Sequence, residues 1–383
     1  MKKALVVGRN YCNILAVARQ LGEAGFSAKV LKIHKTRPKK LNFLRTMSPD
    51  KMSKYVEIYR EVVATEEDVI EAMLEMAEDE KILLLPVDDY SVYQVDENLD
   101  KLQAKFITCS IKGKQGAINE LMDKKKQKEC CNMPTLKSWL LETGDEIPGD
   151  ITYPVFIKPN VSMKATKARM KKCSSREELE TTLAGFGEYS MLCEEFCDIK
   201  NEYSLLGFST CKEAVAPAVF MATRGGHKER KGVAVTGMAV SADRFELFCK
   251  ESEKMVLEMG YTGIFDIDLI EDQEGNIYFV EINFRPGASI YAFDNLTGEF
   301  ARCMLEGGEV RKMKFEPGLS FVSEKVLMEE YVRGDCSKKE FRELIDGADI
   351  CFVKSEEDPA PFEEFKKYYF LADLLRLAYK VKK

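Results

Sequence analysis

FDIDLI (residues 265–270) and NIYFVEINFRPG (residues 276–287) are two apolar runs joined by a short polar turn. Each run has the length of a strand, and the turn predicts that the second run returns beside the first. Asp268, Glu281 and Asn283 stand where a buried strand would carry valine or isoleucine. Glu281 and Asn283 are two residues apart and therefore share one face, and Asp268 can lie across from them.

This cluster offers carboxylate and amide oxygens, the ligands that Mg²⁺ prefers when it is shared with phosphate groups. Arg285 follows Asn283 by two residues and adds a cation to the same face. The alternative is a polar, solvent-facing sheet edge, which Glu-x-Asn alone does not exclude. Further motifs along the chain decide between these two interpretations.

Composition limits the class of protein. The chain has 383 residues, 45% hydrophobic and 32% charged, which predicts a soluble globular protein of two or three domains. Its net charge of −7 argues against nucleic acid as a partner. Neither a secretory signal nor an apolar run of membrane-spanning length is found, so we expect a cytoplasmic protein. The twelve cysteines lack Cys-x-x-Cys spacing and only two histidines occur, so reduced thiols are expected rather than a zinc site.

The N-terminal third predicts a parallel sheet. Strands are expected at residues 3–7, 28–33 and 82–86, with helices at 14–22 and 66–79 between them. The first loop is Gly8-Arg9-Asn10, so a dinucleotide site with a Gly-x-Gly-x-x-Gly loop is not supported. Asp88 and Asp89 follow the third strand, where they can face a ligand or cap the next helix.

The middle of the chain carries isolated lysines and several more strands. Lys124, Lys125, Lys126 and Lys128 form a run that we expect to be mostly a solvated helix face. Lys158 ends an apolar strand at residues 153–159, where a lysine is costly unless it meets an anion. We also predict strands at residues 191–193, 202–208, 214–221 and 233–240, a polar loop at 223–232 and helices at 176–183 and 246–259.

The order of these pieces resembles the ATP-grasp superfamily over roughly residues 1–310. Its members carry an Asp-Lys pair, a strand lysine, a Glu-Glu-Phe turn and metal strands ending in Glu-x-Asn-x-Arg-x-Gly, here residues 123–124, 158, 194–196 and 281–287. The spacing from Asp268 to Glu281 is similar to that of D-alanine–D-alanine ligases. The resemblance is greatest to carboxylate–amine ligases, including D-aspartate ligase-like proteins.

This resemblance implies an α/β chain with α+β grasp lobes. Residues 1–110 would form a Rossmann-like, parallel-sheet pre-ATP-grasp domain, and residues 111–195 the small lobe with the lysine strand and a lid. Residues 196–310 would form the large lobe with the metal strands. Residues 311–383 would be an extension with a helical end, which docks on its own domain or, alternatively, touches a membrane surface.

The resemblance also implies roles for individual residues. Lys124 and Lys158 would contact ATP phosphates, and Glu202 the ribose. The hinge, with backbone groups that read adenine, would be Glu194, Glu195, Phe196 and Cys197. Asp268, Glu281 and Asn283 would hold one or two Mg²⁺, with Mn²⁺ as a substitute. Arg285 would face the transferred phosphoryl group or the substrate carboxylate.

Two departures from the family pattern affect the lid and the substrate site. The lid at residues 160–169 contains no glycine, so Lys164 and Lys167 would replace backbone contacts to phosphate, or the lid is degenerate. Asp266 stands where D-alanine–D-alanine ligases have an arginine. In the cationic loop, Arg224 or Arg230 is expected to contact an acidic substrate group, unless the loop is only solvated.

The expected function is therefore an ATP-dependent ligase that joins a carboxylate to an amine through an acyl phosphate, releasing ADP and phosphate. Its substrates would be small molecules, amino acids among them, and a homodimer is the default assembly. Two alternatives remain open. One is another ATP-grasp chemistry, such as carboxylation or a nucleotide-pathway ligase. The other is a non-catalytic ATP-binding module, which the glycine-free lid suggests.

Overall fold

A parallel sheet forms the N-terminal part of the molecule, as the β-α-β opening predicted. The computed structural model describes residues 2–36, 47–161, 170–187, 189–225, 234–313 and 315–382. In the first sheet the strand order is β3-β2-β1-β4-β5, and every neighbouring pair is parallel. The strands are β1 (Lys3–Gly8), β2 (Ser27–His34), β3 (Val56–Val63), β4 (Ile82–Pro86) and β5 (Phe106–Thr108).

Two capped helices begin at the carboxyl edge of this sheet. Helix α1 (Tyr11–Glu23) starts where the Asn10 side chain accepts a hydrogen bond from the Cys12 amide. Helix α4 (Asp89–Glu97) starts at Asp88, whose carboxylate accepts from the Ser91 amide in a capping box. Asp88 is thus the helix cap that the sequence allowed, and Asp89 is left to make other contacts.

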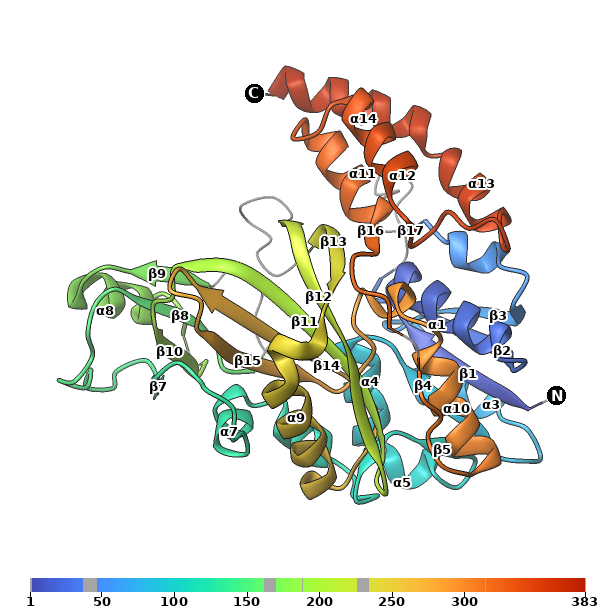
Figure 1. The fold of residues 1–383 in the computed structure, drawn as a ribbon, viewed down its shortest axis with the longest axis horizontal. Coiled ribbons are helices and arrows are strands. Elements are labelled where there is room, and N and C mark those ends of the chain that lie inside the picture. Colours follow the sequence, from blue (N-terminus) through green and yellow to red (C-terminus); the bar gives the residue numbers. More distant parts are fainter. Residues whose placement is uncertain are drawn as a thin grey trace.

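A second, antiparallel sheet lies apart from the first, at the left of Figure 1, with the order β7-β10-β8-β9. Helix α8 (Arg176–Ala184) packs against it, and the pair encloses a small core of its own. Its strands are β7 (Ser138–Leu141), β8 (Val155–Pro159), β9 (Lys171–Cys173) and β10 (Met191–Glu195).

The largest sheet has the order β15-β14-β11-β12-β13-β16-β17, with β6 (Ser110–Ile111) paired to β14. Strands β14 and β15 are the two runs that opened the sequence analysis, and they pair antiparallel as predicted. Their register places Asp268 opposite Glu281 and Asp266 opposite Asn283. The strands are β11 (Ile199–Thr210), β12 (Ala214–Gly225), β13 (Ala234–Val240), β14 (Tyr261–Asp272), β15 (Ile277–Asn283), β16 (Ser320–Val322) and β17 (Ile350–Cys351).

Helices cover and connect these sheets. One face of α1 packs with α10 and the large sheet, and the other face packs with the C-terminal helices. The remaining helices and 3₁₀ turns are α3 (Val69–Glu75), α5 (Leu99–Leu102), α6 (Ala117–Leu121), α7 (Lys124–Glu129), α9 (Glu246–Met259), α10 (Leu296–Glu306), α11 (Glu324–Arg333), α12 (Lys338–Gly347), α13 (Ala360–Lys366), α14 (Tyr369–Lys382), η1 (Pro49–Met52), η4 (Ala242–Phe245) and η5 (Ile290–Ala292).

The C-terminal residues add two strands to the large sheet and several helices beside it. Strands β16 and β17 continue the large sheet, and α11, α12 and α14 pack beside them at the top of Figure 1. Helix α14 docks on this part of its own chain through the fully buried Ala372, while Phe370 and Leu377 face outward. Among the described residues, every helix is too short or too polar to cross a membrane.

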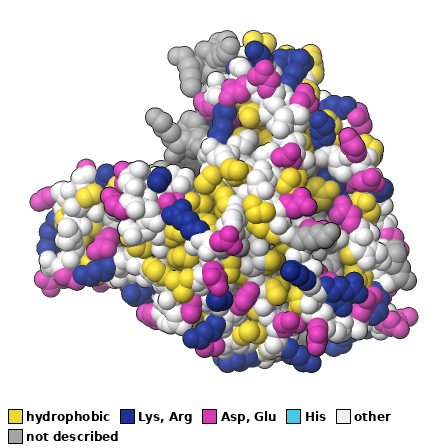
Figure 2. All heavy atoms as spheres, viewed as in Figure 1, with side chains coloured by type: hydrophobic (Ala, Val, Ile, Leu, Met, Phe, Trp, Pro, Cys, Tyr) yellow, Lys and Arg dark blue, Asp and Glu magenta, His cyan; other side chains and the backbone are white. Residues whose placement is uncertain are grey.

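Two sequence expectations need correction. The lysine run is not mostly solvated, because Lys124 and Lys128 are buried, Lys125 is half-buried and only Lys126 is exposed. Residues 223–225 of the loop expected at residues 223–232 belong instead to β12, which continues to Gly225, and the rest of that range lies outside the described residues. In the view of Figure 2, cationic and anionic side chains are interspersed around hydrophobic ones that gather over the middle of the large sheet.

Candidate functional site

A cleft of about 630 Å³ lies between the small sheet and the large sheet. It is lined on one side by residues of β8 and β10 and on the other by residues of β11, β12, β14 and β15. Of the fifteen site residues predicted from the sequence, nine line this single cleft. They are Lys124, Lys158, Glu194, Glu195, Phe196, Cys197, Glu202, Asp268 and Glu281.

The floor of the cleft carries the predicted metal ligands. Asp268 and Glu281 face each other across the β14–β15 ladder, and the Asn283 amide nitrogen lies 3.4 Å from an Asp268 carboxylate oxygen. Two carboxylates and one amide form a donor set that suits Mg²⁺. The amide nitrogen faces Asp268, so metal binding would require Asn283 to turn its oxygen inward. Within the described ranges, no three His, Cys, Asp or Glu side chains gather as a metal site, and Asn283 is the side chain beside this carboxylate pair that the sequence predicted as the third ligand.

Lys124 reaches the same floor from α7. Its ammonium forms an ion pair with Glu281, and its side chain is only 7% exposed. The helix is anchored at its start by Asp123, which accepts a hydrogen bond from the Asn160 amide at 2.6 Å just beyond β8. The predicted phosphate lysine and a predicted metal ligand are therefore in direct contact.

Lys158 and Glu194 meet at the side of the cleft formed by the small sheet. Their strands β8 and β10 are adjacent, and the ammonium lies 2.6 Å from the carboxylate. Lys128 of α7 forms a second ion pair with Glu194 and donates to the Leu136 carbonyl at 3.2 Å. Burial disfavours the charged carboxylate, but the two ammonium groups outweigh it and hold the pKa of Glu194 below its usual range.

The segment after Glu194 forms the hinge side of the cleft. The backbone amides of Glu195 and Phe196 donate to the carbonyls of Lys137 and Pro154, which fixes the turn. The Lys172 ammonium lies 3.9 Å from the centre of the Phe196 ring. Burial raises the pKa of the Cys197 thiol to about 11, so this thiol is protonated at neutral pH.

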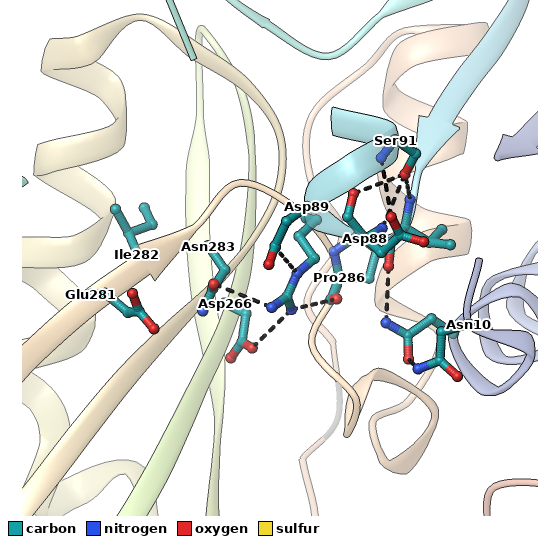
Figure 3. Close-up of polar contacts among 12 residues, drawn as sticks. Asn10, Asp88, Asp89, Ser91, Asp266, Glu281, Ile282, Asn283 and Pro286 are labelled. Atoms are coloured by element: carbon teal, nitrogen blue, oxygen red, sulfur yellow. Dashed lines mark hydrogen bonds and ion pairs between the residues drawn. The ribbon is translucent and has the colours of Figure 1, made fainter. Parts of the chain in front are cut away.

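Arg285 lies at the end of the floor, beside a smaller pocket that shares Lys124 and Glu281 with the cleft. Its guanidinium donates to Asp89 at 2.8 Å and to Asn283 at 3.2 Å, and it lies 3.7 Å from Asp266. Figure 3 shows Asp89, Asp266 and Asn283 converging from α4, β14 and β15. The guanidinium lowers the pKa of Asp89, whereas burial raises the pKa of Asp266.

Four predicted residues remain, of which the structure describes Arg224 alone. Arg224 forms ion pairs with Glu330 and Glu340 of the C-terminal helices. Its guanidinium was expected to contact an acidic substrate group, but in this structure it is neutralised by these two carboxylates. Lys164, Lys167 and Arg230 lie outside the described residues, so their predicted contacts stay predictions.

Two residues that the sequence did not single out help to build the site. The lysine run predicts a solvated position for Lys128, but its spacing of four from Lys124 places both lysines on one side of a helix. Gln127 exchanges hydrogen bonds of 3.0 Å with the backbone N–H and C=O of Ile282, between the two ligands on β15. No pattern in the sequence could reveal that long-range pairing.

The sequence and the fold of this chain were compared with those of known proteins. No family profile matches the sequence, and no curated protein matches it. An L-amino acid ligase from Bacillus licheniformis superposes with a TM-score of 0.59 at 14% identity, over 84% of this chain and 78% of that one. N5-carboxyaminoimidazole ribonucleotide synthetase from Thermotoga maritima superposes with a TM-score of 0.57 at 16% identity, over 84% and 79%.

A third structure was solved with nucleotide bound. The biotin carboxylase domain of Hydrogenobacter thermophilus 2-oxoglutarate carboxylase, in complex with MgADP and bicarbonate, superposes with a TM-score of 0.61 at 16% identity, over 83% of this chain and 73% of that one. All three share the fold described above. The chain therefore has the ATP-grasp fold, and nine of the residues predicted for its site line the cleft between the small sheet and the large sheet.

Proposed function

We propose that this protein is an ATP-dependent ligase that joins a carboxylate to an amine and releases ADP and phosphate. The observation that carries this proposal is the convergence of nine predicted residues on one cleft. Their chemistry suits a nucleotide with its phosphates and metal. Lys158 lies with Glu194 of the hinge on the small-sheet side, and Lys124 lies with Glu281 on the large-sheet side, next to the smaller pocket that Arg285 lines.

In the proposed reaction, the terminal phosphoryl group of ATP moves to a substrate carboxylate and the bond to ADP breaks. The amine then attacks the acyl carbon, and phosphate leaves. Lys124 and Lys158 would offset phosphate charge, and Arg285 would orient the acceptor carboxylate or the moving phosphoryl group. Mg²⁺ held by Asp268, Glu281 and Asn283, or Mn²⁺ in its place, would neutralise charge on the phosphate oxygens.

Amino acids are the substrates we propose to test first, since one structural neighbour is an L-amino acid ligase. Carboxylation is the second candidate, because another neighbour was solved with MgADP and bicarbonate. We retain as proposals the division into domains at residues 110, 195 and 310, a homodimer and a cytoplasmic location. For the third boundary, the continuation of the large sheet into β16 and β17 argues for a later position.

The test is ADP release from Mg-ATP across a matrix of amino acids and small carboxylates, with mass spectrometry of the products. Release that requires both partners and yields a new amide mass would support the ligase. Release that requires bicarbonate would support carboxylation. If Mg-ATP does not bind, the proposed function is wrong.

A further inference from the structure

Three charged side chains form a closed group beside the cleft, which we call the buried triad: Lys128, Glu194 and Lys158. Their exposed fractions are 9%, 5% and 4%. Glu194 uses one carboxylate oxygen for each lysine, with Oε1 paired to Lys128 and Oε2 to Lys158 at 2.6 Å. The two ammonium groups therefore do not compete for one oxygen.

The members of the triad differ in their access to the cleft. Lys158 and Glu194 line it, but Lys128 does not, and the Lys128 ammonium also donates to the Leu136 carbonyl at 3.2 Å. Lys128 and Lys158 therefore hold opposite oxygens of Glu194, and only Lys158 of the two lysines lies at the cleft. An arriving ligand meets Lys158 there.

The charges of the triad do not cancel. Two ammonium groups and one carboxylate leave one excess positive charge in a buried setting, where an unbalanced charge is costly. Burial indeed lowers the pKa of Lys128, against the opposing effect of Glu194. An anion in the cleft beside Lys158 would remove this imbalance.

We propose that Lys128 is a positioning residue that serves as the second counter-ion of Glu194 and so leaves Lys158 available to an anionic ligand in the cleft. By the proposed function, on which this inference rests, that ligand is the phosphate chain of a nucleotide. Without Lys128, Lys158 alone would neutralise Glu194, and the pair would carry no excess charge. Glu194 would then compete with the phosphates for Lys158 and keep its ammonium from them.

The charges of the buried triad predict different affinities for Mg-ATP in a single and a double variant. Lys128→Met leaves Glu194 and Lys158 as a neutral pair, so we expect the Kd for Mg-ATP to rise by about tenfold or more. Removing the carboxylate as well, in Lys128→Met/Glu194→Gln, restores one excess positive charge on Lys158. The double variant should therefore bind Mg-ATP more tightly than Lys128→Met. A residue that only supports the fold would give a double variant no better than the single one.

The experiment is isothermal titration of the full chain with Mg-ATP, with melting temperatures measured alongside. Lys128→Arg should bind within about threefold of the wild type, because it keeps the charge. Lys126→Met is the matched control, since Lys126 is exposed on the same helix and pairs only with Glu120 among the described contacts. It should bind as the wild type does.

Each outcome has a defined meaning. If Lys128→Met binds like the wild type, or the double variant binds no better than Lys128→Met, the inference is overturned and the proposed function stands. If Lys128→Met does not fold, the inference is tested with the double variant alone. That variant has no buried carboxylate at position 194 that would need Lys128 as a counter-ion. Binding within about threefold of the wild type then supports the inference, and a loss beyond about tenfold overturns it. If the wild type itself does not bind Mg-ATP, the proposed function fails and the inference falls with it.

Discussion

Asp266 and Asp268 lie two residues apart on the same face of β14, yet their partners give them different chemistry. Asp266 is buried, accepts a hydrogen bond from Ser204 and faces Arg285. Asp268 faces Glu281 and the cleft. A carboxylate on a strand therefore acquires its role from the residues across the ladder, and Asp268 is the one placed to share a cation.

The metal ligands give the first prediction at the scale of single residues. Asp268→Asn and Glu281→Gln should each lower turnover by about 10²–10³-fold, because each removes one preorganised charge. ADP release measures the effect, and unchanged melting temperatures would show that the fold persists. Glu258→Gln, an exposed change on α9, is the control. Normal turnover in either ligand variant would contradict the metal assignment.

At the scale of elements, the six-residue helix α7 contacts both sheets that line the cleft. Lys124 reaches the large sheet, Lys128 reaches the small sheet, and Gln127 fastens the helix to β15. The sequence predicted a helix at the lysine run. It could not predict which lysines are buried, because their partners Glu281 and Glu194 are many residues away and only the folded chain brings them near.

The Gln127 contact gives a prediction for this helix. Gln127→Ala would leave the buried backbone N–H and C=O of Ile282 without their partner, which should lower the free energy of unfolding by about 1–3 kcal/mol. Urea denaturation would measure this change. Glu129→Ala, an exposed change on the same helix, should have little effect. Equal stability of the two variants would show that Gln127 does not anchor β15.

The far end of the β14–β15 hairpin gives a pH-dependent prediction. Hydrogen bonds from Arg244, Asn201 and Tyr203 lower the pKa of Glu271 to about 2 from the ordinary value of 4.5. Because the folded pKa is depressed, the stabilisation is complete above pH 4.5 and is lost as the pH falls towards 2.

Glu271→Gln should therefore cost roughly 2–3 kcal/mol at pH 7, and the difference from the wild type should shrink between about pH 4.5 and pH 2. Denaturant unfolding at several pH values measures this trend. Glu274→Gln in the exposed turn is the control. A difference that is constant with pH would show that the ionised Glu271 is not the source.

At the scale of the whole molecule, a buried ion pair joins the two ends of the chain. Arg19 of α1 donates to Asp358 at 2.9 Å, and both side chains are at most 1% exposed. Ser53 donates to the same carboxylate at 2.7 Å. The sequence could predict neither partner, since residues 339 positions apart share no local pattern. The short strands β16 and β17 escaped prediction because two or three residues show no periodicity.

Asp358→Ala should lower the free energy of unfolding by about 3–5 kcal/mol, because it leaves the buried Arg19 guanidinium without its counter-ion. Thermal or denaturant unfolding measures the change. Glu357→Ala is the matched control, because Glu357 is adjacent and largely exposed. A loss below about 1 kcal/mol would show that water or another group replaces the pair.

The two-sided packing of α1 has a consequence for how the protein is made. Tyr11, Cys12 and Leu15 pack in the same core as residues 322–372, so this face of α1 lacks its cover until those residues have left the ribosome. At roughly 5–20 residues per second, the wait is on the order of half a minute. The nascent chain thus carries an exposed apolar helix face through most of its synthesis, a natural target for a chaperone that binds emerging chains.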